Sequence, residues 1–382
     1  MIKIVSKDQC CGCHACATVC PRSAITMNAD REGFLYPKVD TDLCVECGLC
    51  ERVCPLNQTV KSDEGKKPSA YAAKNKDESV RRVSSSGGVF TLLAERVLDA
   101  GGVVFGAAFD GARRVRHIAV EKKEDLALLR GSKYLQSRIG DCYRRAREYL
   151  NAGRTVLFSG TPCQIGGLRS YLGKDFENLI CQDIICHGVP ASVTWERALI
   201  EYEKAFGAAV TDVSFRSKSS GWHGYSLSLT LADGRVEEIS HGDVPYMTAF
   251  IGDLCLRPSC YACGFKGLSR VSDLTLADFW GIENVLPHMD DNKGTSLVFV
   301  HSERGAALLR EISQKVELEA VDAADAVRHN PSMLHSARDG GEREAFMRDA
   351  ETMPLLRAVR RHTKKTPVER LKMLLRKILR RV

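Results

Sequence analysis

Two twelve-residue stretches decide the fold at the start of this chain: CCGCHACATVCP at residues 10–21 and CVECGLCERVCP at residues 44–55. Both contain the spacing C-x2-C-x2-C-x3-C followed by a proline, and nine of the sixteen cysteines lie before residue 55. The N-terminus lacks an apolar stretch long enough for a secretory signal, and disulfides are rare in cytosolic proteins. These thiols are therefore expected to be metal ligands or reactive groups.

The repeated spacing is typical of bacterial ferredoxin domains that hold two 4Fe–4S clusters. Three thiolates of each tight loop reach one cluster, and the fourth cysteine reaches across to the other cluster. The predicted ligands are Cys10, Cys13, Cys16 and Cys54 for the first cluster and Cys20, Cys44, Cys47 and Cys50 for the second. Two zinc sites are the alternative, but a zinc ion takes four ligands in one centre and does not require the duplicated set. Cys11 lies outside the pattern and is expected to be a spectator.

The composition is that of an ordinary globular protein, with 382 residues of which 44% are hydrophobic and 27% are charged. No apolar run approaches the roughly 18 residues that a membrane-spanning helix needs. The net charge of +7 is uneven, because residues 355–382 carry a net charge of +10 and leave −3 for the rest of the chain. These features exclude collagen-like, disordered, membrane-spanning and secreted disulfide-rich classes, and they predict a cytoplasmic protein.

Four regions are expected, and their mixture of helices and strands gives the α+β class. They are a two-cluster ferredoxin domain at 1–58, a polar linker at 59–69, an α/β body at 70–350 and a basic amphipathic tail at 351–382.

Within the body, apolar periodicity predicts a series of strands and helices. The expected elements are a helix over 89–98, a strand over 103–109, a strand over 155–158 that leads into a helix, and β-rich segments over 225–231 and 295–300. The sequence after residue 303 is predicted to be mainly helical.

A second group of cysteines lies far downstream, in the spacing Cys255-x4-Cys260-x2-Cys263. Cys186 is the expected fourth ligand, and Cys181 is a less favoured alternative because it lies in a strand-like run. The spacing alone fits a third 4Fe–4S cluster and a four-cysteine zinc site equally well. Cys142 is expected to be a buried structural thiol.

The chain has no GxGxxG and no Walker loop, but it has three loops with small or hydroxyl residues. They are Ser84 to Gly88 before a predicted helix, Gly131 to Tyr134, and the turn at Gly160, Thr161 and Pro162. Free amides at a helix start favour an anion, whereas plain N-capping is the alternative. Cys163, at such a helix start, is either reactive, a contact residue beside a cofactor phosphate, or a buried structural thiol. Because clusters carry single electrons and most organic reductions need two, a flavin is the expected converter.

The chain resembles the coenzyme F420 hydrogenase/dehydrogenase beta-subunit family. The motifs that carry the resemblance are the ferredoxin pair, SSSGGVF, GSKYLQS, SGTPCQIGGL, ICHGVP, LRPSCYACGFK, LADFWGI and NPSM, in this order. In that family a two-cluster ferredoxin module is commonly fused to a flavoprotein body with FAD and a further 4Fe–4S cluster. The resemblance implies FAD contacts from Ser86, Gly87, Gly88, Lys133, Gly160, Thr161, Pro162, Cys163 and Gln164. It also implies that the downstream cluster is iron–sulfur, with the ligands Cys186, Cys255, Cys260 and Cys263.

The C-terminal segment contains a capping box at Thr366-Pro367-Val368-Glu369, followed by apolar residues at helical spacing and many basic ones. A basic amphipathic helix suggests an anionic membrane surface at the inner face of a membrane, or an acidic partner. The alternative is a helix packed on the body with a solvated charged face. No nucleic acid is expected, because aromatic residues do not alternate with the basic ones.

Two functions are therefore considered. The first is an iron–sulfur flavoprotein oxidoreductase that connects a ferredoxin-like donor or acceptor, the clusters and FAD with an organic two-electron substrate of deazaflavin or other type. Its catalytic candidates are His187, Lys133 and Tyr134, because they adjoin the cofactor motifs. The second is a non-catalytic electron-transfer subunit that docks on a partner oxidoreductase.

Overall fold

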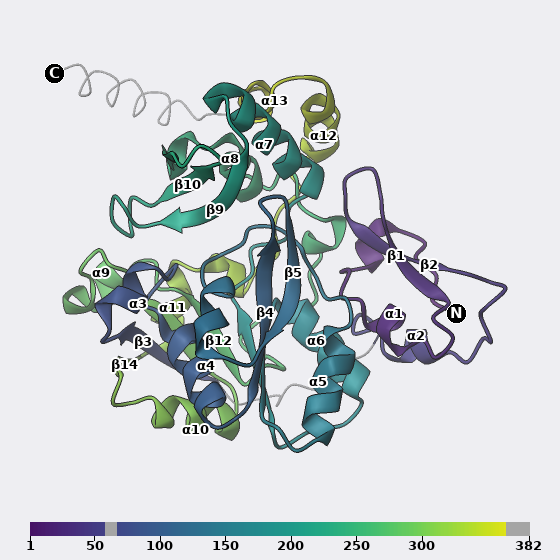
Figure 1. Cartoon of the computed structure of the whole chain (residues 1–382), viewed down its shortest axis with the longest axis horizontal. Helices are drawn as coiled ribbons and strands as arrows, with labels where there is room; N and C mark the ends of the chain where they lie inside the picture. Colours follow the sequence, from purple (N-terminus) through teal and green to yellow (C-terminus); the bar gives the residue numbers. More distant parts are fainter. Residues whose placement is uncertain (58–66, 364–382) are drawn as a thin grey trace.

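The computed structural model describes residues 1–57 and 67–363 (Figure 1). Most of the predicted linker and the predicted helix after residue 366 lie outside the described residues. Within the described ranges, no helix is both long and apolar enough to cross a membrane.

The N-terminal module is a small unit built on one hairpin, β1 Ile25–Ala29 and β2 Leu35–Val39, which pair antiparallel. Two short helices carry cysteines, α1 Ala15–Val19 and α2 Leu49–Arg52. Its own hydrophobic cluster contains only four buried residues, Ile2, Cys16, Ile25 and Cys50, and two of these are cysteines. So small a core supports the expectation that bound metal contributes much of the module's folding energy.

The body contains a nine-stranded sheet with the order β14-β3-β13-β12-β8-β7-β4-β5-β6. Its strands are β3 Ser69–Asn75, β4 Val103–Asp110, β5 Arg114–Val120, β6 Ser137–Arg138, β7 Val156–Ser159, β8 Leu179–Ile184, β12 Leu274–Asp278, β13 Ser296–Val300 and β14 Val316–Val321. Strands β4, β7, β8 and β12 are parallel neighbours, and β3 runs in the same direction beyond the antiparallel β13. The carboxyl ends of these five strands therefore share one edge, where ligands bind in open α/β sheets.

Helices cover both faces of this sheet (Figure 1). Side chains alternate along β4, so Val104 packs with one face and Val103 and Phe105 with the other. The covering helices are α4 Val89–Asp99 and α10 Glu303–Glu311 on the first face, and α5 Cys142–Asn151 and α6 Pro162–Leu172 on the second. Shorter helices lie at α3 Glu78–Arg82, α9 Ile282–Val285 and α11 Ala323–Arg328. The second face also receives Cys13, Ala15 and Val53 of the N-terminal module.

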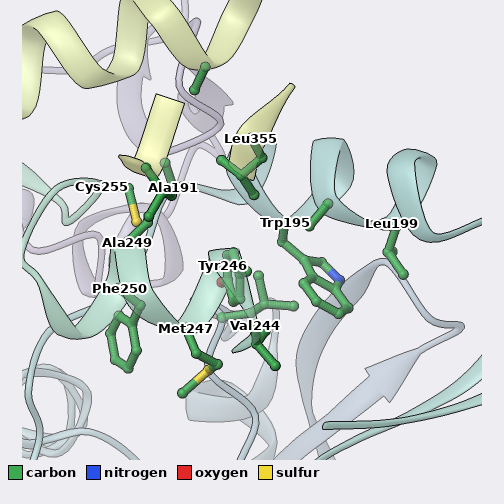
Figure 2. Packing of buried hydrophobic residues seen from close by; sticks show 14 of the residues in the cluster. Ala191, Trp195, Leu199, Val244, Tyr246, Met247, Ala249, Phe250, Cys255 and Leu355 are labelled. Atoms are coloured by element: carbon green, nitrogen blue, oxygen red, sulfur yellow. The ribbon is translucent and has the colours of Figure 1, made fainter. Parts of the chain in front are cut away.

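A second lobe combines a three-stranded antiparallel sheet with four helices (Figure 1). The strands are β9 Val210–Ser217, β10 Ser226–Leu231 and β11 Val236–Ser240, and the helices are α7 Ser192–Phe206, α8 Pro245–Ile251, α12 Arg343–Thr352 and α13 Leu355–His362. Their shared core is centred on the fully buried rings of Trp195, Phe215 and Tyr246, part of which is drawn in Figure 2.

The sequence after residue 303 is mainly helical, as predicted, and it also contains the edge strand β14 with its alternating apolar and acidic residues. Helix α13 was assigned to the basic tail, yet Leu355, Ala358 and Val359 are buried in the core of the second lobe. The packed body therefore extends at least to the end of α13, and its arginines occupy the outer face of that helix.

Two buried arginines of the body bind the N-terminal module. Arg343 donates to both carboxylate oxygens of Glu32, at 3.2 Å for one of them, and its Nε donates to the carbonyl of Leu256 at 2.7 Å. Arg257 donates to the carbonyls of Cys10 at 2.7 Å and Leu35 at 2.9 Å. Directional bonds from buried cations hold the module in one orientation on the body.

Replacing Glu32 by Gln should destabilise the docked protein strongly, because it leaves the buried Arg343 charge without its counter-ion. Removing one partner of a buried pair costs about 3–5 kcal/mol. The measurement is the denaturation midpoint of the anaerobically prepared protein. The matched control is Glu311→Gln, in the exposed pair with Arg96, where about 0–1 kcal/mol is expected. Equal effects of the two substitutions would contradict this account of docking.

Candidate metal centres and cofactor loops

The first set of predicted cluster ligands lines one recess of the N-terminal module. Its four thiols belong to Cys10, Cys13, Cys16 and Cys54, and the recess encloses about 340 Å³ including its mouth. Burial, together with the thiols of Cys10 and Cys54, raises the pKa of Cys16 to about 12. Each thiolate in this apolar recess disfavours the ionisation of its neighbours. A bound metal cluster would balance the negative charge of the four thiolates.

The second set lines another recess of similar size, about 370 Å³ including its mouth. Its thiols belong to Cys20, Cys44, Cys47 and Cys50. The backbone amide of Ile2 donates to the sulfur of Cys50 at 3.2 Å, and Ala24 donates to Cys20 at 3.3 Å. The fourth cysteine of each repeat thus lies with the three cysteines of the other repeat, in the arrangement that the spacing predicted. Cys47 is exposed, so one member of this set reaches the protein surface.

A third recess lies between the module and the carboxyl edge of the large sheet. Its thiols belong to Cys163, Cys186, Cys260 and Cys263, with Cys11 at its border. Cys163 follows β7 and Cys186 follows β8, which are neighbouring parallel strands. Burial is the main cause that raises the pKa of Cys260 to about 12, and the thiols of Cys163 and Cys263 add to it. The recess encloses about 600 Å³ including its mouth, which leaves room beyond that of the two recesses in the module.

Cys255 was assigned to this downstream set, and the structure contradicts that assignment. Its side chain is fully buried in the hydrophobic core of the second lobe, near Ala191 and Ala249 (Figure 2). The carbonyl of Cys255 accepts a bond from the amide of Ala191, which fixes the segment against the start of α7. The recess receives Cys163 instead, a residue that had been assigned to the cofactor loops. The alternative ligand Cys181 is also outside the recess, because it is buried within the sheet.

Cys11 lies on the boundary between the first and third recesses and lines both of them. A hydrogen bond with Cys11 is the largest cause that raises the pKa of Cys163, ahead of burial. The expectation that Cys11 is a spectator therefore overlooked its position between two sets of thiols. Its position next to Cys10 was its only signal in the sequence.

Two of the predicted cofactor loops are joined to each other. The hydroxyl of Ser85 accepts a bond from the backbone amide of Ser132 at 2.6 Å. Beside them, Lys133 donates its ammonium protons to the carbonyls of Arg130 and Gly131, at 2.7 and 3.2 Å. Burial lowers the pKa of Lys133 to about 8.

The glycine pair of the first loop serves packing. The amide of Gly87 donates to the hydroxyl of Ser296 at 2.9 Å, and the hydroxyl of Ser86 donates to the carbonyl of Thr295 at 2.8 Å. A Cβ at Gly87 would lie 2.3 Å from the carbonyl oxygen of Ala73, so only glycine lets the loop approach β3 this closely. Gly88 then begins α4 with a φ of +79°. These polar groups of Ser86 and Gly87 are therefore used within the protein.

The third loop is also closed by its own residues. Thr161 and Gln164 form a capping box at the start of α6, with Pro162 in the first turn. The Gln164 side chain accepts from the amide of Thr161 and donates to the carbonyl of Ser137, each at 3.0 Å. Gly160 is bonded through its amide to the carbonyl of Gln182 on β8.

Two buried polar atoms at this edge have no hydrogen-bond partner among the described residues, Oε1 of Gln182 and Nε of Arg216. Arg216 also pairs with Asp278 at the end of β12, donates to the carbonyl of Ser85 and lies 4.1 Å from the ring centroid of Tyr225. A buried unpaired polar atom costs about 1–3 kcal/mol. An unpaired acceptor and an unpaired donor are groups that a polar ligand can bind, and neither residue was predicted from the sequence.

The three catalytic candidates have partners within the chain. His187 lines the third recess, with Nε2 2.7 Å from the carboxylate of Asp253. The hydroxyl of Tyr134 accepts a bond from Arg216 at 3.3 Å. The rings of His187 and Tyr134 both pack against Phe250, with centroids 5.1 and 5.3 Å from its ring.

Comparison with known proteins gives the family. The model "Coenzyme F420 hydrogenase/dehydrogenase, beta subunit N-term" matches residues 70–141, and the corresponding C-terminus model matches residues 153–326. A 4Fe-4S dicluster domain model matches residues 9–57. No curated protein matches this sequence.

Among solved structures, a chain of the F420-reducing [NiFe] hydrogenase complex from Methanosarcina barkeri is similar, at 15% identity and a TM-score of 0.47. The similarity covers 70% of this chain and 91% of that chain. The two models of one family together match more than half of the chain. The chain therefore belongs to the coenzyme F420 hydrogenase/dehydrogenase beta-subunit family, an oxidoreductase family, and carries a 4Fe–4S dicluster domain at its N-terminus.

Proposed function

We propose that this protein is an iron–sulfur flavoprotein oxidoreductase in which three 4Fe–4S clusters connect a redox partner protein with FAD and an organic two-electron substrate. The observation that carries the proposal is the succession of three recesses, each lined by at least four cysteines. The first and third recesses share Cys11 and Leu56 as wall residues. Ile2 links the first recess to the second, because it lines one and bonds Cys50 of the other.

In this proposal the third cluster is held by Cys163, Cys186, Cys260 and Cys263. Zinc would need only the four thiols, and the spacing alone does not exclude it. The iron–sulfur assignment is supported by the adjoining recess of the first cluster, since a redox-inactive ion between that cluster and the flavin would interrupt the path.

FAD, when bound, would convert single electrons from the clusters into a two-electron transfer. Gln182 and Arg216 would hold it at the carboxyl edge of the sheet, supported by the loop at Ser85. Lys133, which is held by the carbonyls of Arg130 and Gly131, would help to orient the ring. The substrate remains a two-electron carrier of deazaflavin or other type.

One observation favours the second candidate, a non-catalytic electron-transfer subunit. The polar groups of Ser86, Gly87 and Gln164 bond within the protein, so the predicted FAD loops contribute few free donors. In that case the second cluster, next to the exposed Cys47, and the third cluster would be the two ends of a path between partner proteins.

Anaerobic purification followed by measurement of iron, sulfide, zinc and flavin per chain separates these functions. The proposed enzyme should contain about twelve irons and one FAD. Twelve irons without flavin would support the electron-transfer subunit, whereas eight irons with one zinc would contradict the third cluster.

The assignment of Cys163 in place of Cys255 predicts different effects of two alanine substitutions. Cys163→Ala should remove about a third of the iron, because one of three clusters loses a ligand. Cys255→Ala should leave the iron content unchanged, although it opens a small cavity in an apolar core. Iron analysis and low-temperature electron paramagnetic resonance (EPR) of the reduced proteins would measure this. The opposite pattern would restore Cys255 as a ligand.

A further inference from the structure

We propose that Arg257 is the counter-cation of the first cluster and positions it beside the third, so that its charge raises the reduction potential of the first cluster. This inference rests on the proposed function, because it requires that the thiol-lined recesses hold clusters. It concerns a residue that the reaction chemistry itself does not use.

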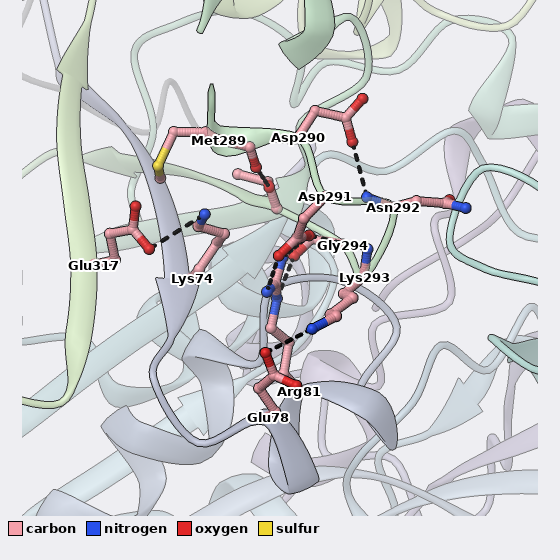
Figure 3. Close-up of polar contacts among 12 residues, drawn as sticks. Lys74, Glu78, Arg81, Met289, Asp290, Asp291, Asn292, Lys293, Gly294 and Glu317 are labelled. Carbon is pink, nitrogen blue, oxygen red and sulfur yellow. Dashed lines mark hydrogen bonds and ion pairs between the residues drawn. The ribbon is translucent and has the colours of Figure 1, made fainter. Parts of the chain in front are cut away.

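The surroundings of Arg257 differ from those of every other buried arginine in the described residues. Five arginines are buried there, and four of them form an ion pair with a carboxylate: Arg81 with Asp291, Arg216 with Asp278, Arg270 with Asp183 and Arg343 with Glu32. The first of these pairs is drawn in Figure 3, where the guanidinium of Arg81 faces both carboxylate oxygens of Asp291. Arg257, which is 0% exposed, has no such carboxylate among the described residues.

The partners of Arg257 are neutral. Its three nitrogens donate to the carbonyl of Cys10 at 2.7 Å, the carbonyl of Leu35 at 2.9 Å and the amide oxygen of Gln136 at 3.1 Å. Its guanidinium also lies 4.3 Å from the ring centroid of Tyr36. A buried charge without a counter-ion costs several kcal/mol, so an anion is expected nearby.

The chain places that anion at the recess of the first cluster. A cluster held by four thiolates carries a net negative charge, which grows when it accepts an electron. Arg257 binds the carbonyl of the ligand Cys10, and a Cβ at Gly12 in the same loop would lie 2.8 Å from its guanidinium. A positive charge fixed beside the cluster would stabilise its reduced form more than its oxidised form.

The same residue also belongs to the loop of the third recess. The amide of Cys260 donates to the backbone carbonyl of Arg257 at 2.8 Å. Gln136, bonded to the guanidinium, donates to the carbonyl of Cys11 at 3.2 Å. One side chain and its own backbone thus join the cysteine loops of two recesses, which fixes the separation of the two clusters.

The experiment is a redox titration of the anaerobic full-length protein, followed by EPR after iron and sulfide analysis. Arg257→Gln should lower the equilibrium constant for one-electron reduction of the first cluster at least tenfold, which is about 59 mV. Arg257→Lys, which keeps the charge, should retain most of the potential. Gln136→Glu is a second test that leaves Arg257 in place. The new carboxylate would balance the charge of Arg257, so the potential should fall as it does in Arg257→Gln.

Arg81→Gln is the matched control, since it removes a buried arginine whose charge Asp291 already balances. This control should change the equilibrium constant for one-electron reduction of the first cluster less than twofold. If the clusters are present but neither Arg257→Gln nor Gln136→Glu shifts the potential, the inference is wrong and the proposed function survives. If Arg257→Gln, Gln136→Glu and Arg81→Gln shift the potential equally, the inference is also wrong. A wild-type protein without clusters would overturn both.

Discussion

Electron transfer between separate centres requires that they be held close together, and in this chain that constraint falls on the contact between the N-terminal module and the body. The module has only four buried residues in a hydrophobic cluster of its own, and it packs Cys13, Ala15 and Val53 onto the body. Two buried arginines from the body, Arg257 and Arg343, add directional bonds to this apolar contact. Burying two cations is costly, which explains why one is paired with Glu32 and why the other lies beside a thiol-lined recess.

The third recess follows from the topology of the large sheet. Because β7 and β8 are parallel neighbours, the residues that follow them meet at the same edge, and Cys163 and Cys186 come together although 22 residues separate them. Cys260 and Cys263 reach this edge from the loop after α8. Asp8, Cys11 and Leu56 of the module also line the recess, so the docked module contributes part of its wall.

The parts that the sequence predicted well are those that depend on local spacing. Each predicted cysteine set of the module lines one recess, because the repeat encodes a loop geometry within a few residues. The strands at 103–109 and 155–158 were also predicted, since apolar periodicity is a local property. The third set was only partly predicted, because spacing cannot distinguish a cysteine that faces a recess from one such as Cys255 that faces a core. Arg257 had no local signal at all, since its partners lie more than 100 residues away in the sequence.

The predicted FAD loops show why a residue pattern and a binding site are different things. Serines and glycines before a helix favour an anion only when their amides and hydroxyls remain free. Here the hydroxyl of Ser86 and the amide of Gly87 donate hydrogen bonds to Thr295 and Ser296. The close approach of the loop to β3 explains the pattern. The unpaired buried atoms of Gln182 and Arg216 are a stronger argument for a polar ligand, because their desolvation is uncompensated unless something binds them. In the proposed function, recognition at this edge would therefore depend on Gln182 and Arg216, which no sequence motif marks, while the motif residues build the loops near them.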